Sequence, residues 1–208
     1  LANGSEPWKI PDLDKIPKIK NNLISETDGE VPFYPYKRDD ETLARQWAIP
    51  GTKGLEHRIG GLEKADGSGN VSYDPENHHN MTLKRQEKVN RVSKFIPKIN
   101  VFGENSGKLL VVGWGGTFGS IRSGVSKAQS EGLSVSHIHL KYINPFPENL
   151  GDILVKFDKI LIPELNLGQL LSIIRGTYLV DAKGYNKVKG KPFTSSEILN
   201  EIKTYLEE

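Results

Sequence analysis

Three consecutive residues, Glu56, His57 and Arg58, have the side chains best suited to chemistry in the first half of the chain. Glycines flank them at Gly54 and Gly60, and glycine lets a backbone approach a ligand or another chain closely. Arginine binds carboxylates through paired hydrogen bonds, and histidine titrates near neutral pH. We expect the triplet to line a substrate cavity. An interface loop held by internal ion pairs is the alternative.

A glycine-rich turn, Gly113–Gly119, lies between an expected strand and an expected helix. Glycines at such a turn allow backbone amides to approach a phosphate. The spacing is GxGxxxG instead of GxGxxG, and Leu140 and Lys141 stand where a ribose-binding acid should end the second strand. We therefore interpret the segment as a tight strand-to-helix turn. Contact with an anion or a partner loop at Gly115, Gly116 and Thr117 remains open, as does nucleotide binding.

Other polar residues are open to simpler interpretations. His137 and His139 lie two apart on an expected strand and share a face, but a metal site needs further ligands, so we expect an edge or interface position. Glu164 follows the third expected strand, where it would contact another domain or protomer, and a capping role for Asn166 is the alternative. The run from Arg38 to Arg45 is interpreted as a solvated helical turn.

The expected secondary structure that positions these residues changes near residue 100, from irregular segments to regular strands and helices. Eight of the twelve prolines lie in residues 1–100, which predicts an irregular segment without long regular elements. The stretch Trp47–His79 has no sustained periodicity but contains large apolar residues, which is typical of a segment that wraps a partner surface. One helix is expected near 79–95, with Asp74 or Asn77 as its cap.

Residues 101–208 alternate between apolar runs and amphipathic stretches. This pattern predicts an α/β domain with a small parallel sheet covered by helices. Thr194 and Glu197 match a capping box at the last helix. The expected strands are Leu109–Trp114, Leu133–Leu140, Lys159–Pro163 and Leu179–Asp181; the expected helices are Thr117–Gln129, Asn149–Phe157, Leu167–Tyr178 and Ser195–Leu206.

Composition restricts the possible functions. The formal net charge is +2, which gives no electrostatic reason to expect nucleic-acid binding. No apolar run approaches the length of a membrane span, so no membrane association is expected. The chain has no cysteine and therefore offers no thiolate ligands for an iron–sulfur cluster, and we expect a cytoplasmic location.

Several separated strings resemble the α subunit of the 2-oxoacid:ferredoxin oxidoreductases, and the 2-oxoglutarate branch is the most similar. The resemblance runs across nearly the whole chain. The strings are Leu1–Pro11 (LANGSEPWKIP), Phe33–Met81, Val111–Arg122 (VVGWGGTFGSIR), Asn144–Gly151 (NPFPENLG) and Pro163–Leu170 (PELNLGQL). It implies a domain similar to the C-terminal domain of transketolase at 101–208, preceded by the irregular, Pro/Gly-rich segment. Because the chain begins at Leu1, we expect a C-terminal fragment.

The resemblance implies an enzyme that converts 2-oxoglutarate and coenzyme A to succinyl-CoA and CO₂ and reduces ferredoxin. Thiamine diphosphate, magnesium and an iron–sulfur cluster are expected in the full complex and none on this fragment, to which no catalytic residue is carried over. A distal substrate carboxylate would suit Arg58. The expected partners are the β subunit, the N-terminal part of the α subunit, ferredoxin and a second protomer. The fragment is expected to be an inactive assembly domain. Pyruvate or branched-chain substrates, or a non-catalytic nucleotide- or anion-binding module, are the alternatives.

Overall fold

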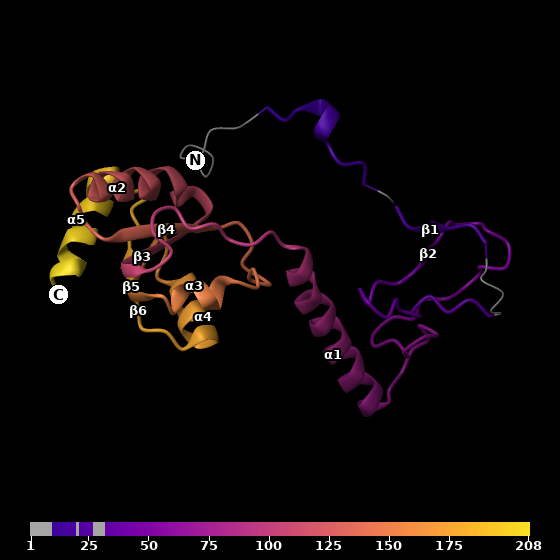
Figure 1. The fold of residues 1–208 in the computed structure, drawn as a ribbon. Helices are drawn as coiled ribbons and strands as arrows, with labels where there is room; N and C mark the ends of the chain where they lie inside the picture. The colour runs from indigo at the N-terminus through magenta and orange to yellow at the C-terminus, as the bar shows by residue number, and fades with distance from the viewer. Residues whose placement is uncertain (1–9, 20, 27–31) are drawn as a thin grey trace. The chain divides into compact units, whose positions relative to one another are not determined.

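The computed structural model of the chain describes residues 10–19, 21–26 and 32–208 (Figure 1). Residues 1–9, which include most of the first string that carries the resemblance, lie outside these ranges. The chain divides into two compact units. One is Pro11–Phe95, called the first unit below, and the other contains Ile96–Glu208 and is called the sheet unit.

The first unit has little regular structure apart from one long helix. It contains the 3₁₀ turn η1 (Leu13–Lys15), the two-residue parallel strands β1 (Leu23–Ile24) and β2 (Trp47–Ala48), and the helix α1 (Pro75–Arg91), which continues into η2 (Val92–Phe95). Isolated antiparallel bridges join the segments between them, as at Lys64 and Val71. Irregular backbone is thus held by turns and by contacts with one helix.

Two predictions for this unit need correction. The helix expected at 79–95 begins four residues earlier, at Pro75, because proline fits the first helical position and the Asp74 side chain accepts a hydrogen bond from the Glu76 amide (3.1 Å). The helical turn expected from Arg38 to Arg45 is wrong. These two arginines face each other in an isolated antiparallel bridge, because Asp39 folds the chain into a turn by accepting a bond from the Thr42 amide (2.6 Å).

The sheet unit is a four-stranded parallel sheet with helices on both faces, as the sequence pattern predicted. Its strands are β3 (Gly107–Trp114), β4 (Val135–Leu140), β5 (Phe157–Glu164) and β6 (Ala182–Asn186), in the spatial order β4-β3-β5-β6. Helices α2 (Phe118–Ser130) and α5 (Ser195–Glu207) cover one face, and α3 (Leu150–Leu154) and α4 (Gln169–Tyr178) cover the other (Figure 1).

Alternate residues of the strands supply the two hydrophobic cores. Leu109 and Val111 of β3 point toward α2 and α5, whereas Leu110 and Val112 point toward α3 and α4, as the twofold periodicity of a strand requires. All four side chains are fully buried. A strand buried on both faces reads as a continuous apolar run, which explains why β3 was recognisable in the sequence.

The last strand and α3 differ from the predictions. The strand expected at Leu179–Asp181 is wrong: Leu179 has a left-handed backbone (φ 53°) that ends α4, and β6 begins at Ala182. Arg175 holds this corner by donating to the Ala182 carbonyl (2.7 Å). Helix α3 ends at Leu154 instead of Phe157, because Phe157 already pairs with β3. The capping box of α5 is confirmed: the Glu197 amide donates to Thr194 Oγ1 (3.1 Å).

None of the helices in the described part of the chain is long and apolar enough to cross a membrane.

Candidate functional site

The carboxyl ends of the strands bring together residues that are far apart in the sequence. The strand order reverses direction at β3, because the chain moves from β3 to β4 on one side and then to β5 on the other. Open α/β sheets bind ligands at the carboxyl edge of such a switch point. Trp114 ends β3 and Glu164 ends β5, and Trp114 Nε1 donates to Glu164 Oε1 (3.3 Å). This edge is the candidate site of the sheet unit.

Glu164 is fully buried and its carboxylate is used within the chain. Oε1 accepts a hydrogen bond from the Leu170 amide (2.9 Å) and one from Asn166 Nδ2 (3.2 Å), and Oε2 accepts one from the Leu171 amide (3.1 Å). These amides belong to the first turn of α4, where the helix dipole favours a negative charge. Glu164 thus occupies the anion position of this helix. Asn166 caps the same end by accepting from the Gly168 amide (2.7 Å).

The glycine-rich turn has two parts with different roles. Gly113 allows close packing: a Cβ there would lie 2.8 Å from Ile121 Cδ1 and 2.9 Å from His139 Nδ1. Thr117 is buried, and its hydroxyl donates to the Trp114 carbonyl (2.8 Å), which closes the 3₁₀ turn η3 (Gly115–Thr117) before α2. Gly115, in contrast, is exposed and has a left-handed backbone (φ 56°). Gly115 and Gly116 each line a surface pocket at this end of the sheet.

A pocket of about 470 Å³ opens beside Gly116. Its other walls are Leu165, after β5, and the loop that follows β6, which includes Lys187, Val188 and Lys191. Lys187 Nζ is held by Glu197 (2.8 Å to each oxygen), so the loop is anchored to the start of α5. Sequence reasoning missed this loop, although the run Lys187-Val-Lys-Gly-Lys191 has an apolar residue isolated among lysines.

His137 and His139 share a face of β4, as predicted, and that face packs against α2. His137 is fully buried, and neither ring nitrogen has a hydrogen-bond partner among the residues that the structure describes. Burial first, and then the charges of Arg122 and His139, lower the pKa of His137 to about 3. Arg122 lies over the Phe102 ring, with Cζ 3.6 Å from the ring centroid. This environment keeps His137 neutral. β4 is an edge strand, but the ring of His137 is not satisfied by hydrogen bonds within the described residues, as an edge position was expected to allow.

The triplet Glu56–Arg58 lies on an exposed loop of the first unit. Glu56 Oε2 accepts a hydrogen bond from the Gly54 amide (2.8 Å), and His57 Nδ1 lies 2.8 Å from the Leu55 carbonyl oxygen. The His57 ring meets the Phe33 ring edge to face at 5.1 Å. Two of the three side chains are therefore positioned by their own loop. Arg58 is exposed and makes no hydrogen bond or ion pair within the described ranges.

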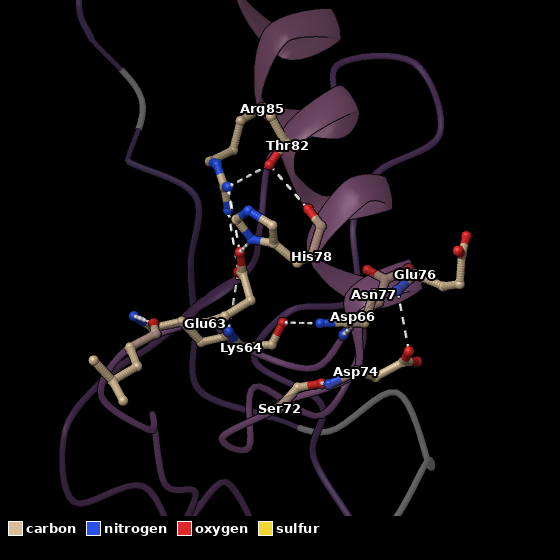
Figure 2. Close-up of polar contacts among 11 residues, drawn as sticks. Glu63, Lys64, Asp66, Ser72, Asp74, Glu76, Asn77, His78, Thr82 and Arg85 are labelled. Atoms are coloured by element: carbon tan, nitrogen blue, oxygen red, sulfur yellow. Dashed lines mark hydrogen bonds and ion pairs between the residues drawn. The ribbon is translucent and has the colours of Figure 1, made fainter.

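The first unit also contains a polar network that fixes α1 to the preceding loop (Figure 2). Glu63 is its centre: Arg85 donates to both carboxylate oxygens (3.2 and 3.4 Å), and His78 Nδ1 lies 2.5 Å from Oε2. These hydrogen bonds, that of Arg85 first and that of His78 second, lower the pKa of Glu63 to about 2. Asn77 Nδ2 donates to the Lys64 carbonyl (2.9 Å). The network closes one wall of a second pocket, of about 810 Å³.

Comparison with known proteins identifies a set of relatives. No protein-family model matches the chain. The 2-oxoglutarate oxidoreductase subunit KorA of Mycobacterium tuberculosis is 51% identical over 199 residues, which are 95% of this chain and 30% of that protein. The 2-oxoacid:ferredoxin oxidoreductase subunit alpha of Saccharolobus solfataricus is 27% identical over 208 aligned positions, and the match covers 97% of this chain and 30% of that subunit. The chain belongs to the 2-oxoacid:ferredoxin oxidoreductase α-subunit family.

A solved structure agrees with this assignment. The 2-oxoglutarate:ferredoxin oxidoreductase of Magnetococcus marinus, with 2-oxoglutarate, coenzyme A and succinyl-CoA bound, matches with a TM-score of 0.84 and 28% identity over 94% of this chain and 34% of that one. The chain spans about a third of the length of these relatives. The part of the α subunit that this chain represents includes both regions described above: the carboxyl edge of the sheet and the first unit.

Proposed function

We propose that the chain is the C-terminal part of the α subunit of a 2-oxoglutarate:ferredoxin oxidoreductase. The complete enzyme converts 2-oxoglutarate and coenzyme A to succinyl-CoA and CO₂, and the electrons pass to ferredoxin. The observation that carries the proposal is the 51% identity to the Mycobacterium tuberculosis subunit over 95% of this chain. The ligands named for the Magnetococcus marinus structure support the choice of substrate and acyl acceptor. We place the enzyme in the cytoplasm.

The prosthetic groups of this reaction do not fit the residues of this chain. An iron–sulfur cluster is bound by thiolates, and the chain has no cysteine, so these ligands lie outside the 208 residues. The residues that the structure describes gather no group of three metal-ligating side chains for the magnesium of thiamine diphosphate. Thiamine diphosphate would stabilise a carbanion in the complete enzyme. We therefore assign no catalytic step to this chain, and we expect it to be inactive alone.

We assign the carboxyl edge of the sheet to assembly. Leu165 and Val188, which line the pocket beside Gly116, expose 39% and 64% of their surface, and Leu167, two residues after Leu165, exposes 87%. Exposed apolar side chains that gather at one place mark contact surfaces. The proposed partners at this edge are the N-terminal part of the α subunit, the β subunit and a second protomer. Glu164 supports the edge from inside, and Gly115 and Gly116 supply the part of the turn that faces it.

Arg58 is the proposed reader of the distal carboxylate of 2-oxoglutarate. Its guanidinium is exposed, while Glu56 and His57 hold the loop. Arg58→Ala is expected to raise the KM for 2-oxoglutarate about tenfold, because a charge-assisted bond contributes about 1.5–3 kcal/mol. Turnover of pyruvate, which has no distal carboxylate, is expected to stay unchanged. An equal loss for both substrates would contradict the assignment.

The test of the function is reconstitution of the complete enzyme. The full α subunit is expressed with its β subunit, and reduction of a viologen dye is followed with coenzyme A and 2-oxoglutarate, pyruvate or a branched-chain 2-oxoacid. Turnover that is fastest with 2-oxoglutarate is expected, and a preference for another 2-oxoacid would reassign the substrate within the same class. If no 2-oxoacid is turned over by enzyme that holds its cluster and thiamine diphosphate, the reaction is wrong and a binding role takes its place.

A further inference from the structure

The second pocket, in the first unit, is strongly basic. Its volume is about 810 Å³, and its charged walls are Arg38 and Arg45 from the 36–45 loop, Glu63 and Lys64 from the next turn, and Arg85 and Lys88 from α1. Five arginine and lysine side chains thus surround a single carboxylate. A concave surface lined by charges of one sign focuses its field on ligands of the opposite sign.

The single carboxylate does not neutralise the pocket. Glu63 is already paired with Arg85 and His78 in the network of Figure 2, and its lowered pKa keeps it ionised at neutral pH. Lys64 Nζ donates a hydrogen bond to the Leu62 carbonyl (2.6 Å), but a neutral carbonyl does not balance the charge of the ammonium group. After the Glu63–Arg85 pair is subtracted, the charges of Arg38, Arg45, Lys64 and Lys88 remain.

Arg38 and Arg45 are held in place without an acidic partner in the described part of the chain. The Tyr36 ring lies beside both, with its centroid 4.3 Å from Arg45 Cζ and 5.9 Å from Arg38 Cζ. Arg38 Nη1 donates to the carbonyl of Leu43 (3.1 Å). Leu43 has a left-handed backbone (φ 55°). The two guanidinium groups are therefore fixed at the wall of the pocket.

The type and number of charges indicate the ligand. Guanidinium groups match phosphate oxygens through paired hydrogen bonds, and four unbalanced positive charges exceed what a dicarboxylate neutralises but suit a diphosphate. Leu62, Met81 and Val89 add apolar walls for the carbon part of the ligand. We propose that this pocket binds a small molecule that carries a diphosphate, with Arg38 and Arg45 on the phosphates and Lys88 at the rim. Nucleoside diphosphates and coenzyme A both contain this group. The inference rests on the pocket alone and not on the proposed reaction.

The proposal is tested by calorimetric titration of the complete α subunit with inorganic pyrophosphate, ADP, coenzyme A and succinate. The diphosphate compounds are expected to bind, and succinate at least tenfold more weakly. Tighter binding of ADP or of coenzyme A than of pyrophosphate identifies which carbon part the apolar walls accept. Affinity is expected to fall as salt rises from 50 to 300 mM, because exposed charges are screened. No binding of any diphosphate, or equal binding of succinate, would overturn the proposal.

Variants locate the binding. Arg45→Gln and Lys88→Gln are each expected to weaken pyrophosphate binding at least tenfold. The affinity of Arg45→Lys is expected to lie between those of the wild type and Arg45→Gln, because lysine keeps the positive charge but lacks the paired donors of the guanidinium. Lys94→Gln is the matched control: Lys94 is exposed in η2, outside the pocket, and its loss changes the net charge equally. Lys88 is exposed on α1, so its variant tests the site without disturbing the fold.

Two results would reassign the pocket. Equal weakening by Lys94→Gln and Lys88→Gln would show that binding follows net charge and not this pocket. Binding to the α subunit alone that disappears in the assembled enzyme would show that an acidic segment of a partner occupies the pocket, and the small-molecule proposal would then be wrong.

Discussion

His137 shows how a single buried side chain sets the pH dependence of the sheet unit. In the folded protein burial holds its pKa near 3, whereas an unfolded histidine has a pKa near 6.5. Below pH 6.5 the unfolded chain therefore binds a proton that the folded chain excludes. The contribution of His137 to stability is complete above pH 6.5 and is lost as the pH falls toward 3.

We expect the free energy of unfolding to fall by about 1.4 kcal/mol per pH unit between pH 6 and 4 from His137 alone. Urea denaturation followed by circular dichroism at several pH values measures this slope. His137→Leu is expected to reduce the slope by that amount, because the titrating group is gone. His79→Leu, which removes an exposed histidine of α1, is the control. An unchanged slope in His137→Leu would mean that His137 is protonated in the folded protein.

At the scale of an element, Glu164 determines how α4 begins. Its buried carboxylate accepts bonds from the Leu170 and Leu171 amides, from Asn166 and from Trp114 Nε1. Glu164→Gln places an amide donor against these donors and is expected to destabilise the protein by about 2–3 kcal/mol. The midpoint of urea denaturation measures the loss. Glu148→Gln, at an exposed position, is expected to have no effect, and a similar loss there would count against the role given to Glu164.

The sequence predicted elements where local pattern decides the structure. β3 is a continuous apolar run, and the Thr194–Glu197 box marks the start of α5, so both were found. β6 (AKGYN) has no apolar run, and its position depends on where Leu179 ends α4. The bonds of Glu164 and the pairing of Arg38 with Arg45 depend on turns that bring distant atoms together, which neither spacing nor periodicity reveals.

At the scale of the whole molecule, the proposed assembly surface is the carboxyl edge of the sheet. Leu167 exposes 87% of its surface there, so Leu167→Asp leaves the fold intact but places a charge in the proposed contact. We expect at least a tenfold loss of α subunit retained by tagged β subunit. Leu179→Asp is the matched control, because Leu179 is equally exposed (89%) at the other end of α4. Retention of Leu167→Asp at the wild-type level would remove this edge from the assembly surface.

The short bridge between Phe102 and His137 has a further consequence. The two residues exchange both backbone hydrogen bonds (2.9 Å each) along the outer side of β4, which is an edge strand. An uncovered edge is a template on which another chain can add a strand, and repeated addition leads to fibres. Here the protein's own backbone occupies this position. The bridge thereby blocks strand addition at His137, at the middle of this edge, when newly made copies of the chain are close together.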